Sequence, residues 1–285
     1  MTNPSTPDLD TALNPLIDAF SGRVSIALQR FSDGFSHTYR ATETMSAASL
    51  IKLPILMAAL ARVAQGDLTL TSRYELRAED QVDGSGVLHT LSPGLALTLH
   101  DLLTLMTIVS DNTATNMLID IAGQNAVNDF CQGAGLTQTR LVGKLQLPKE
   151  KRNEAQRRGE TNTTCAADML GLLTSLQRGD LLPAELTQVA LEILQKQQFT
   201  EALARYLPTD RDLSKDAVTV ASKSGCLRGV WHDAGLVYAR SGEPLYTLVV
   251  MTADSHDRSF SFEQEGMMLI AEVSRRTFKT LKRFH

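Results

Sequence analysis

Three short segments of this chain carry side chains that together could attack a carbonyl group. Ser49 and Lys52 are three positions apart, so on a helix their hydroxyl and ammonium groups would lie side by side. The other two segments are Ser110-Asp111-Asn112 and Lys223-Ser224-Gly225. A serine nucleophile beside a lysine, a second serine that relays protons and a second lysine that holds an anion are the parts of a serine acyl-transfer site.

The first segment predicts a nucleophile at the start of a helix. The apolar run 53–64 follows Lys52, and Pro54 is tolerated only near a first helical turn, so the helix begins close to Ser49. Backbone N–H groups there stabilise developing negative charge. Burial would lower the pKa of Lys52 and let it share the role of base. In isolation, the same pattern also fits a simple N-cap serine and a solvated lysine.

The second segment follows the apolar stretch 102–109 and precedes another predicted helix. A loop there lets Ser110 and Asn112 point into a cleft, while Asp111 caps the next helix. Ser110 could pass a proton to a leaving nitrogen, and the Asn112 amide could bind a substrate amide carbonyl. The alternative for this tripeptide alone is plain helix capping.

The third segment is predicted to end a strand at residues 218–222. Lys223 supplies a positive charge for a substrate carboxylate, and Ser224 adds a hydroxyl donor. Gly225 allows the substrate to approach the backbone closely. The backbone N–H of Cys226 would complete an oxyanion hole with that of Ser49, and its thiol is the weaker candidate for a nucleophile.

Composition excludes several other functions. The 285 residues are 43% hydrophobic and 21% charged, which is typical of a globular protein, and the net charge of −4 argues against nucleic acid as a partner. No apolar run approaches the ~18–20 residues of a membrane span. Three cysteines far apart predict no disulfide framework, and no His/Cys cluster has metal-ligand spacing, so we expect no metal and no cofactor. We also expect a monomer.

Residues 1–5 lack the basic and apolar regions of a signal peptide, which leaves open a cytoplasmic protein or one whose leader has been removed.

Periodicity predicts strands at both ends of the chain and helices between them. Expected strands cover 24–28, 35–39, 218–222, 235–239 and 245–252, and expected helices cover 8–20, 53–64, 102–109, 116–121, 166–176, 183–197 and 264–282. The predicted fold is a two-lobed α/β (α+β) protein. Residues 1–45 and 206–285 form a lobe with an antiparallel sheet flanked by helices, and residues 46–205 form an all-helical lobe. The active site would lie between the lobes.

With its three segments in this order, the chain resembles the class A serine β-lactamases and the related penicillin-binding proteins. The stretches 46–54, 110–116 and 159–164 are similar to that family's nucleophile helix, Ser-Asp-Asn region and omega-loop exit. The resemblance implies the two-lobed fold and an acyl-enzyme on Ser49. It also implies that Lys223 and Ser224 bind the substrate carboxylate, and it favours class A over groups that place a Tyr in the second segment.

The resemblance is weakest where class A enzymes activate the water that removes the acyl group. Those enzymes use an omega-loop Glu with an Asn four residues later. Counting back from Gly159 places the Glu at Glu150, yet the residue four positions on is Glu154, and Asn153 is one residue short. Glu150 is therefore the expected base and Glu154 the alternative, while a solvated surface loop explains Glu150 equally well.

The expected function is thus a serine β-lactamase that hydrolyses the β-lactam amide through Ser49, with a small-molecule β-lactam or acyl-peptide substrate. Two alternatives share the same acylation chemistry. One is a related serine hydrolase, either a D-alanyl peptidase or an esterase. The other is a penicillin-binding sensor that is acylated and does not turn over.

Overall fold

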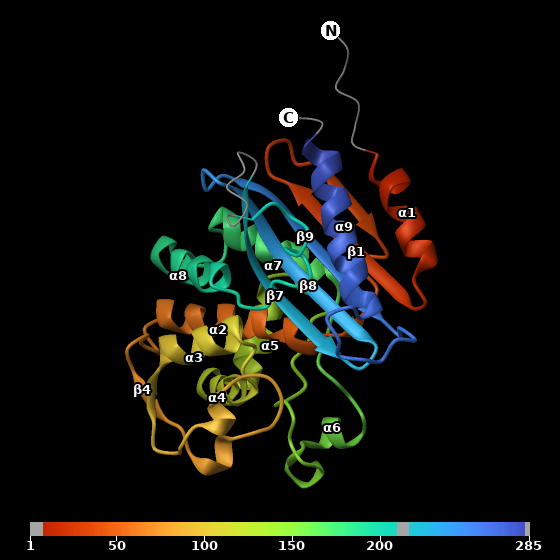
Figure 1. Cartoon of the computed structure of the whole chain (residues 1–285). Helices are drawn as coiled ribbons and strands as arrows, with labels where there is room; N and C mark the ends of the chain where they lie inside the picture. The colour runs from red at the N-terminus through yellow and green to blue at the C-terminus, as the bar shows by residue number, and fades with distance from the viewer. Residues whose placement is uncertain (1–7, 210–216, 283–285) are drawn as a thin grey trace.

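The computed structural model describes residues 8–209 and 217–282. Its centre is a five-stranded antiparallel sheet with the strand order β2-β1-β9-β8-β7, so strands from both ends of the chain pair directly (Figure 1). The fold class is therefore as predicted. The start of the chain, on which the question of a leader depends, lies outside the described residues.

The α-helices are α1 (Leu9–Ala19), α2 (Lys52–Ala64), α3 (Leu99–Ile108), α4 (Asn112–Ala122), α5 (Gln124–Gly133), α6 (Glu154–Arg157), α7 (Ala166–Arg178), α8 (Ala184–Gln195) and α9 (Glu265–Lys282). Short 3₁₀ helices are η1 (Ala48–Ile51), η2 (Ala78–Asp80), η3 (Leu88–Thr90) and η4 (Lys149–Lys151). The sheet strands are β1 (Arg23–Arg30), β2 (Ser36–Tyr39), β7 (Val218–Leu227), β8 (Val230–Ala239) and β9 (Pro244–Ala253). Two small ribbons pair β3 (Met45–Ser46) with β6 (Thr163–Thr164) and β4 (Arg73–Glu75) with β5 (Ala96–Thr98).

Strand β7 is longer than the sequence pattern predicts. It continues through Lys223-Ser224-Gly225 to Leu227 and turns back into β8 through Arg228-Gly229. The polar third segment interrupts the apolar alternation, which is why periodicity alone ended the strand at residue 222. The segment therefore lies on a paired strand, and its backbone is held by β8 along its full length.

The core packs on both faces of the sheet. One cluster joins α2, α3, α4, α7 and α8 to one face, and a second joins α1 and α9 to the other. Helix α7 falls within the range predicted for the helical lobe, yet it packs against β1 and β9, where Thr174 bonds Thr247. The exact lobe boundaries remain a prediction.

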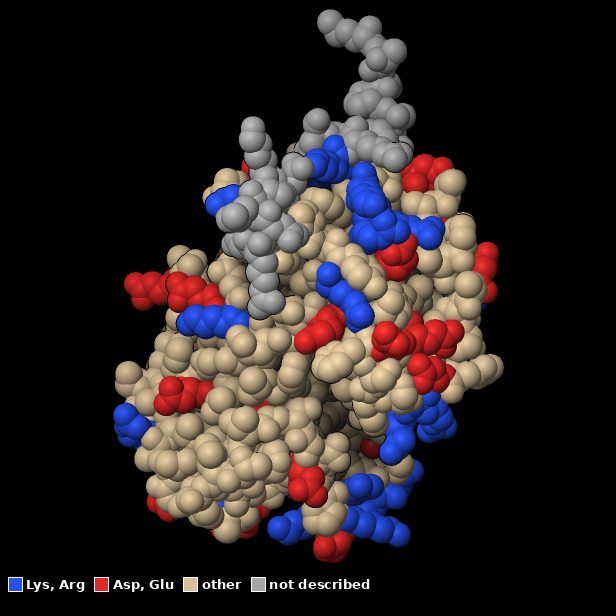
Figure 2. Space-filling model, viewed as in Figure 1, with Lys and Arg blue, Asp and Glu red and all other residues tan. Residues whose placement is uncertain are grey.

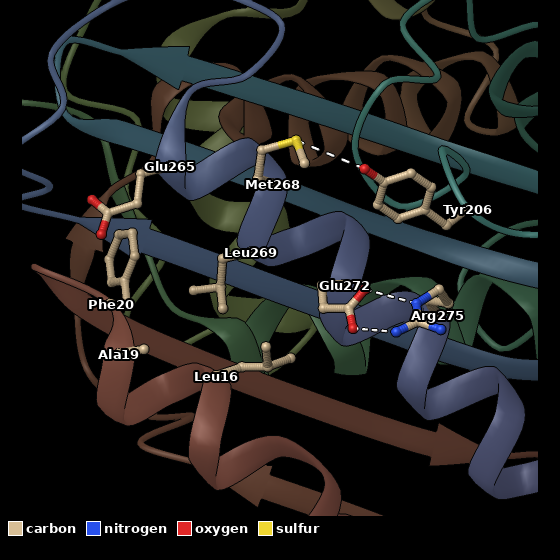
Figure 3. Close-up of a pocket in the computed structure, with 9 residues that line it drawn as sticks. All are labelled: Leu16, Ala19, Phe20, Tyr206, Glu265, Met268, Leu269, Glu272 and Arg275. Atoms are coloured by element: carbon tan, nitrogen blue, oxygen red, sulfur yellow. Dashed lines mark hydrogen bonds and ion pairs between the residues drawn. The ribbon is translucent and has the colours of Figure 1, made fainter.

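Helices α1 and α9 lie side by side on the outer face of the sheet, and a shallow groove of about 480 Å³ runs between them (Figure 3). Leu16, Phe20 and Leu269 line it, and the ion pair between Glu272 and Arg275 borders it. Across residues 8–209 and 217–282, no helix is long and apolar enough to cross a membrane.

Candidate active site

The nucleophile candidate lies in a short, strained turn. Ser49 belongs to the 3₁₀ helix η1, and Ala48 immediately before it has φ +44°, in the left-handed region that L-residues rarely adopt. Helix α2 then begins at Lys52. Strand β7 packs against η1, and a methyl group on Gly225 would lie 2.7 Å from the backbone nitrogen of Ser49. Only glycine therefore allows this strand so close to the turn.

Lys52 is buried and bonds to the second segment rather than to Ser49. Its Nζ lies 3.0 Å from Ser110 Oγ, 2.5 Å from the Ser110 carbonyl oxygen and 2.9 Å from Asn112 Oδ1. Burial, and then the charge of Lys223, hold the pKa of Lys52 well below its ordinary value. A lowered pKa favours the neutral amine, which can accept a proton from a hydroxyl, so the environment suits a general base.

Lys223 bonds to the same Ser110 hydroxyl. Its Nζ lies 3.2 Å from Ser110 Oγ and 2.6 Å from the carbonyl oxygen of Ser224, and its side chain is fully buried. Burial lowers the pKa of Lys223 to about 8. Ser110 itself has φ +53°, a second strained residue at the site. The structure therefore places one hydroxyl between two lysines, the arrangement expected of a proton relay.

Asp111 and Asn112 fix this hydroxyl in place. Asp111 accepts from the backbone N–H of Ala114 and so caps α4, and its other oxygen accepts from the N–H groups of Val87 and Leu88. The Asn112 amide donates to the Asp83 carbonyl at 3.2 Å. An amide nitrogen has two hydrogens, so one N–H of Asn112 is left for a substrate carbonyl.

Ser49 lies where two cavities meet. We call the larger, about 850 Å³, the polar compartment and the smaller, about 190 Å³, the apolar compartment. The polar compartment is lined by Ser46, Ala48, Ser49, Gly84, Ser85, Asn112, Lys144, Leu145, Gln146, Leu147, Arg152, Gln156, Gly159, Glu160, Thr161, Asn162, Cys226, Leu227, Arg228 and Phe260. The apolar compartment is lined by Ser49, Ser85, Ser110, Phe199, Glu201, Ala202, Ser224, Gly225, Cys226, Trp231, Phe262 and Met267.

Seven of the predicted site residues thus lie at or directly behind these cavities: Ser49, Ser110, Asn112, Ser224, Gly225 and Cys226 in the walls, and Lys52 behind Ser110 and Asn112. Lys223 lies buried behind Ser110 and Ser224, so its charge acts from beneath the wall. Burial raises the pKa of the Cys226 thiol despite the two lysines, which keeps it protonated and a poor nucleophile.

The structure does not bring Glu150 or Glu154 to the nucleophile. Glu150 is exposed on η4, Glu154 is exposed at the start of α6, and neither belongs to the lining of either compartment. Leu145 lines the polar compartment instead, and Asn116 holds its backbone through two hydrogen bonds of 2.8 and 2.9 Å. Among the described residues of this lining, Glu160 is the one carboxylate.

Sequence patterns gave no signal for several wall residues. Ser85, Phe199, Glu201 and Phe260 come from segments without helical or strand periodicity, and only chain folding brings them together. His232 on β8 bonds through its Nε2 to the Ser46 carbonyl, 2.8 Å away, and so ties β8 to the nucleophile turn. No group of three His, Cys, Asp or Glu side chains within residues 8–209 and 217–282 could hold a metal ion.

Comparisons with known proteins agree with this architecture. The model of the beta-lactamase enzyme family matches residues 8–281. A beta-lactamase of Rhodobacter capsulatus is 28% identical over 251 residues, which cover 88% of this chain and 81% of that protein. The crystal structure of a beta-lactamase from Sphaerobacter thermophilus has a TM-score of 0.83 and 29% identity, covering 96% of this chain and 97% of that one. PBP-A has a TM-score of 0.82 and 26% identity, covering 97% and 96%, and a mutant of it has been solved as an acyl-enzyme complex with penicillin G.

Proposed function

This chain belongs to the beta-lactamase enzyme family, and from that premise we propose that it is a serine hydrolase whose Ser49 is acylated by β-lactams. The substrate is a small molecule with a strained amide and a nearby carboxylate. The ring opens when Ser49 attacks the amide carbonyl, and the acyl group stays on the serine as an ester. Because the broken bond lies within a ring, the leaving nitrogen remains attached to the acyl group.

Each step of acylation has a residue to perform it. We assign Lys52 as the base that takes the proton of the Ser49 hydroxyl once substrate is bound, although its hydrogen bonds in this structure go to Ser110 and Asn112. The backbone N–H groups of Ser49 and Cys226 stabilise the oxyanion. Ser110, which bonds Lys52, passes a proton to the ring nitrogen. Lys223 supplies positive charge beneath the substrate carboxylate, and the hydroxyl of Ser224 donates to it.

One observation carries this proposal: the Ser110 hydroxyl lies 3.0 Å from Lys52 Nζ and 3.2 Å from Lys223 Nζ. Two buried ammonium groups at one hydroxyl would repel each other, so the arrangement favours one neutral lysine. A structural role alone gives no reason to bury two lysines here, because both incur a desolvation penalty. The proposed roles explain the burial of both lysines: Lys52 is the base, Lys223 attracts the substrate anion, and Ser110 relays protons beside them.

A second candidate, an acyl-enzyme that persists, is favoured by the composition of the polar compartment. Removal of the acyl group needs an activated water, and Leu145 and Leu147 occupy the wall there. Glu160, the one carboxylate among the described residues that line the polar compartment, is bound by Arg158 at 2.9 Å and Arg140 at 3.2 Å. These ion pairs hold the pKa of Glu160 below its ordinary value, which weakens it as a base.

A time course of the acyl-enzyme separates the two candidates. The protein is mixed with excess benzylpenicillin, the free drug is removed, and the mass of the protein is followed over hours. For a hydrolase, the adduct disappears within the first measurement and nitrocefin is turned over many times. For a persistent acyl-enzyme, one adduct per chain remains and nitrocefin shows a single burst. Absence of both an adduct and turnover would refute the proposed function.

A further inference from the structure

We propose that the acyl side chain of the substrate carries a negative charge, which Arg152 and Arg228 bind at the polar compartment. This inference rests on the proposed function, because it concerns the group that Ser49 receives. It narrows the substrate class to β-lactams, or related acyl compounds, with an acidic acyl side chain.

The charges that line the polar compartment do not cancel. Three cations line it, and Lys144 is paired with Asp120 at 2.5 Å. Glu160 is paired with two arginines that lie outside the lining. Arg152 and Arg228 are left, and neither has a carboxylate partner within the described residues. The cavity is therefore positive although the whole chain has a net charge of −4.

Both guanidinium groups keep nitrogens available for an anion. Arg152 uses its Nε to donate to the Leu147 carbonyl at 2.9 Å, which orients the side chain and leaves its two terminal nitrogens available. Arg228 lies in the turn between β7 and β8, over the Phe260 ring at 5.6 Å from its centroid. A planar guanidinium matches the two oxygens of a carboxylate, so each can bind an anion in a bidentate manner.

The position of Arg228 shows which part of the substrate it would meet. Arg228 follows the expected oxyanion donor Cys226 by two residues, so it lies near the acyl carbonyl. The carboxylate on the leaving-group side is assigned to Ser224, which lines the apolar compartment and not the polar one. The acyl side chain is thus the part that enters the polar compartment.

The surface agrees with this placement. Figure 2 shows Lys and Arg side chains gathered beside a hollow, over the region that carries α6 in Figure 1. Leu147, Leu227 and Phe260 add apolar wall to the same compartment. The cavity therefore suits an acyl side chain with an aryl body and an acidic group.

Three penicillins test the inference because their acyl side chains differ at one carbon. Benzylpenicillin carries hydrogen there, carbenicillin a carboxylate and ampicillin an ammonium group. The second-order rate of Ser49 acylation is measured for each by competition with a fluorescent penicillin. We expect carbenicillin to react fastest and ampicillin slowest, with a ratio of about tenfold, since exposed charge pairs contribute modestly. High salt should reduce the ratio.

Substitutions then assign the preference to the two residues. In the double variant Arg152→Gln/Arg228→Gln, the ratio of the carbenicillin to the ampicillin acylation rate should fall until the charge of the acyl side chain no longer affects the rate. The rate for benzylpenicillin should change least. Arg228→Gln alone is informative because, among the described residues, Arg228 makes no hydrogen bond that holds the 144–160 segment. Arg157→Gln is the matched control, since Arg157 is exposed on the same segment and lies outside both linings.

The possible outcomes separate the inference from its premise. Equal rates for the three penicillins, or a preference that survives in the double variant, would overturn the inference and leave acylation of Ser49 intact. No adduct with any of the three would refute the proposed function, and the inference with it. A fall of the ratio in Arg157→Gln as large as in the double variant would also overturn it, because general surface charge would then explain the preference.

Discussion

Lys52 and Lys223 are both buried, and both bond to one hydroxyl group, that of Ser110. The relationship joins the start of α2 to the middle of β7 through the loop before α4. It also ties the protonation of one lysine to that of the other, because the charge of Lys223 lowers the pKa of Lys52. Most of the testable consequences of this site follow from it.

Ser110→Ala should slow acylation by benzylpenicillin by about 10²- to 10⁴-fold, the usual contribution of a positioned proton-transfer group. The variant removes the relay and the shared acceptor, while Asp111 still caps α4. The second-order acylation rate measures the effect. Thr104→Ala, which removes a hydroxyl that bonds the His100 carbonyl within α3, is the matched control and should leave the rate unchanged. A rate for Ser110→Ala close to that of wild type would remove Ser110 from the mechanism.

The acylation rate should first rise and then fall as the pH increases. It rises with pH as Lys52 loses its proton, because the neutral amine is the base. It falls as pH passes about 8, where Lys223 loses the charge that attracts the substrate carboxylate. With a neutral ester that lacks a carboxylate, the acylation rate should still rise with pH but should not fall above about pH 8. A penicillin rate that continues to rise well above that pH would contradict the role given to Lys223.

Lys223→Met should stabilise the protein while impairing acylation. The pKa of Lys223 is lowered from 10.5 to about 8 in the folded chain, so the unfolded chain binds more protons between these values. The free energy of unfolding therefore rises with pH in that window, and the buried amine costs roughly 3 kcal/mol at about pH 7. Thermal melts of both proteins across this window and just below it measure the effect. A variant that melts at a lower temperature than wild type near neutral pH would count against it.

Gly225→Ala should reduce acylation by about 10²- to 10³-fold, the effect of losing one oxyanion donor. The added methyl group would lie 2.7 Å from the Ser49 backbone nitrogen, so β7 and the nucleophile turn must separate. Gly171→Ala in α7 is the control, because nothing lies within 4 Å of the added group and alanine favours a helix. If both variants react at the wild-type rate, the close approach of β7 has no catalytic value.

Glu150→Gln and Glu154→Gln should leave both acylation and the lifetime of the acyl-enzyme unchanged within about twofold, because surface substitutions rarely disturb a site. Both carboxylates are exposed and outside the cavity linings. The measurement is the decay of the benzylpenicillin adduct by mass spectrometry. A much longer lifetime in either variant would show that the carboxylate reaches the site during the reaction.

Sequence patterns predicted the elements whose periodicity is local. Helices α1 and α9 and strand β1 were found because one face of each is apolar at a regular interval, and α2 was found because its sequence is a continuous apolar run. The ribbon of β3 and β6 was missed because each strand has two residues, and helix α5 was missed because it is short and half of its residues are polar. Short elements of this kind are determined by tertiary packing rather than by propensity.

The same distinction holds for the site. Ser49, Lys52, Ser110 and Lys223 could be singled out because each stands within a recognisable local segment. Arg152 and Glu160 could not be, since their places in the wall depend on how the 144–160 segment closes over the cavity. Glu150 was chosen by counting back from Gly159, which assumes that the backbone of this segment follows the same course as in class A enzymes. The spacing of residues alone does not determine that course.

The role of Ser49 as the nucleophile is tested most directly by intact-mass analysis with peptide mapping. Wild type and the variants Ser49→Ala and Ser85→Ala are incubated with benzylpenicillin, since Ser85 is a second serine that lines both compartments. Opening of the ring expels nothing, so the predicted gain is the full mass of one penicillin molecule, located on the peptide that contains Ser49. Ser85→Ala should take up the same adduct and Ser49→Ala none. An adduct of equal stoichiometry on Ser49→Ala would contradict the assignment of the nucleophile.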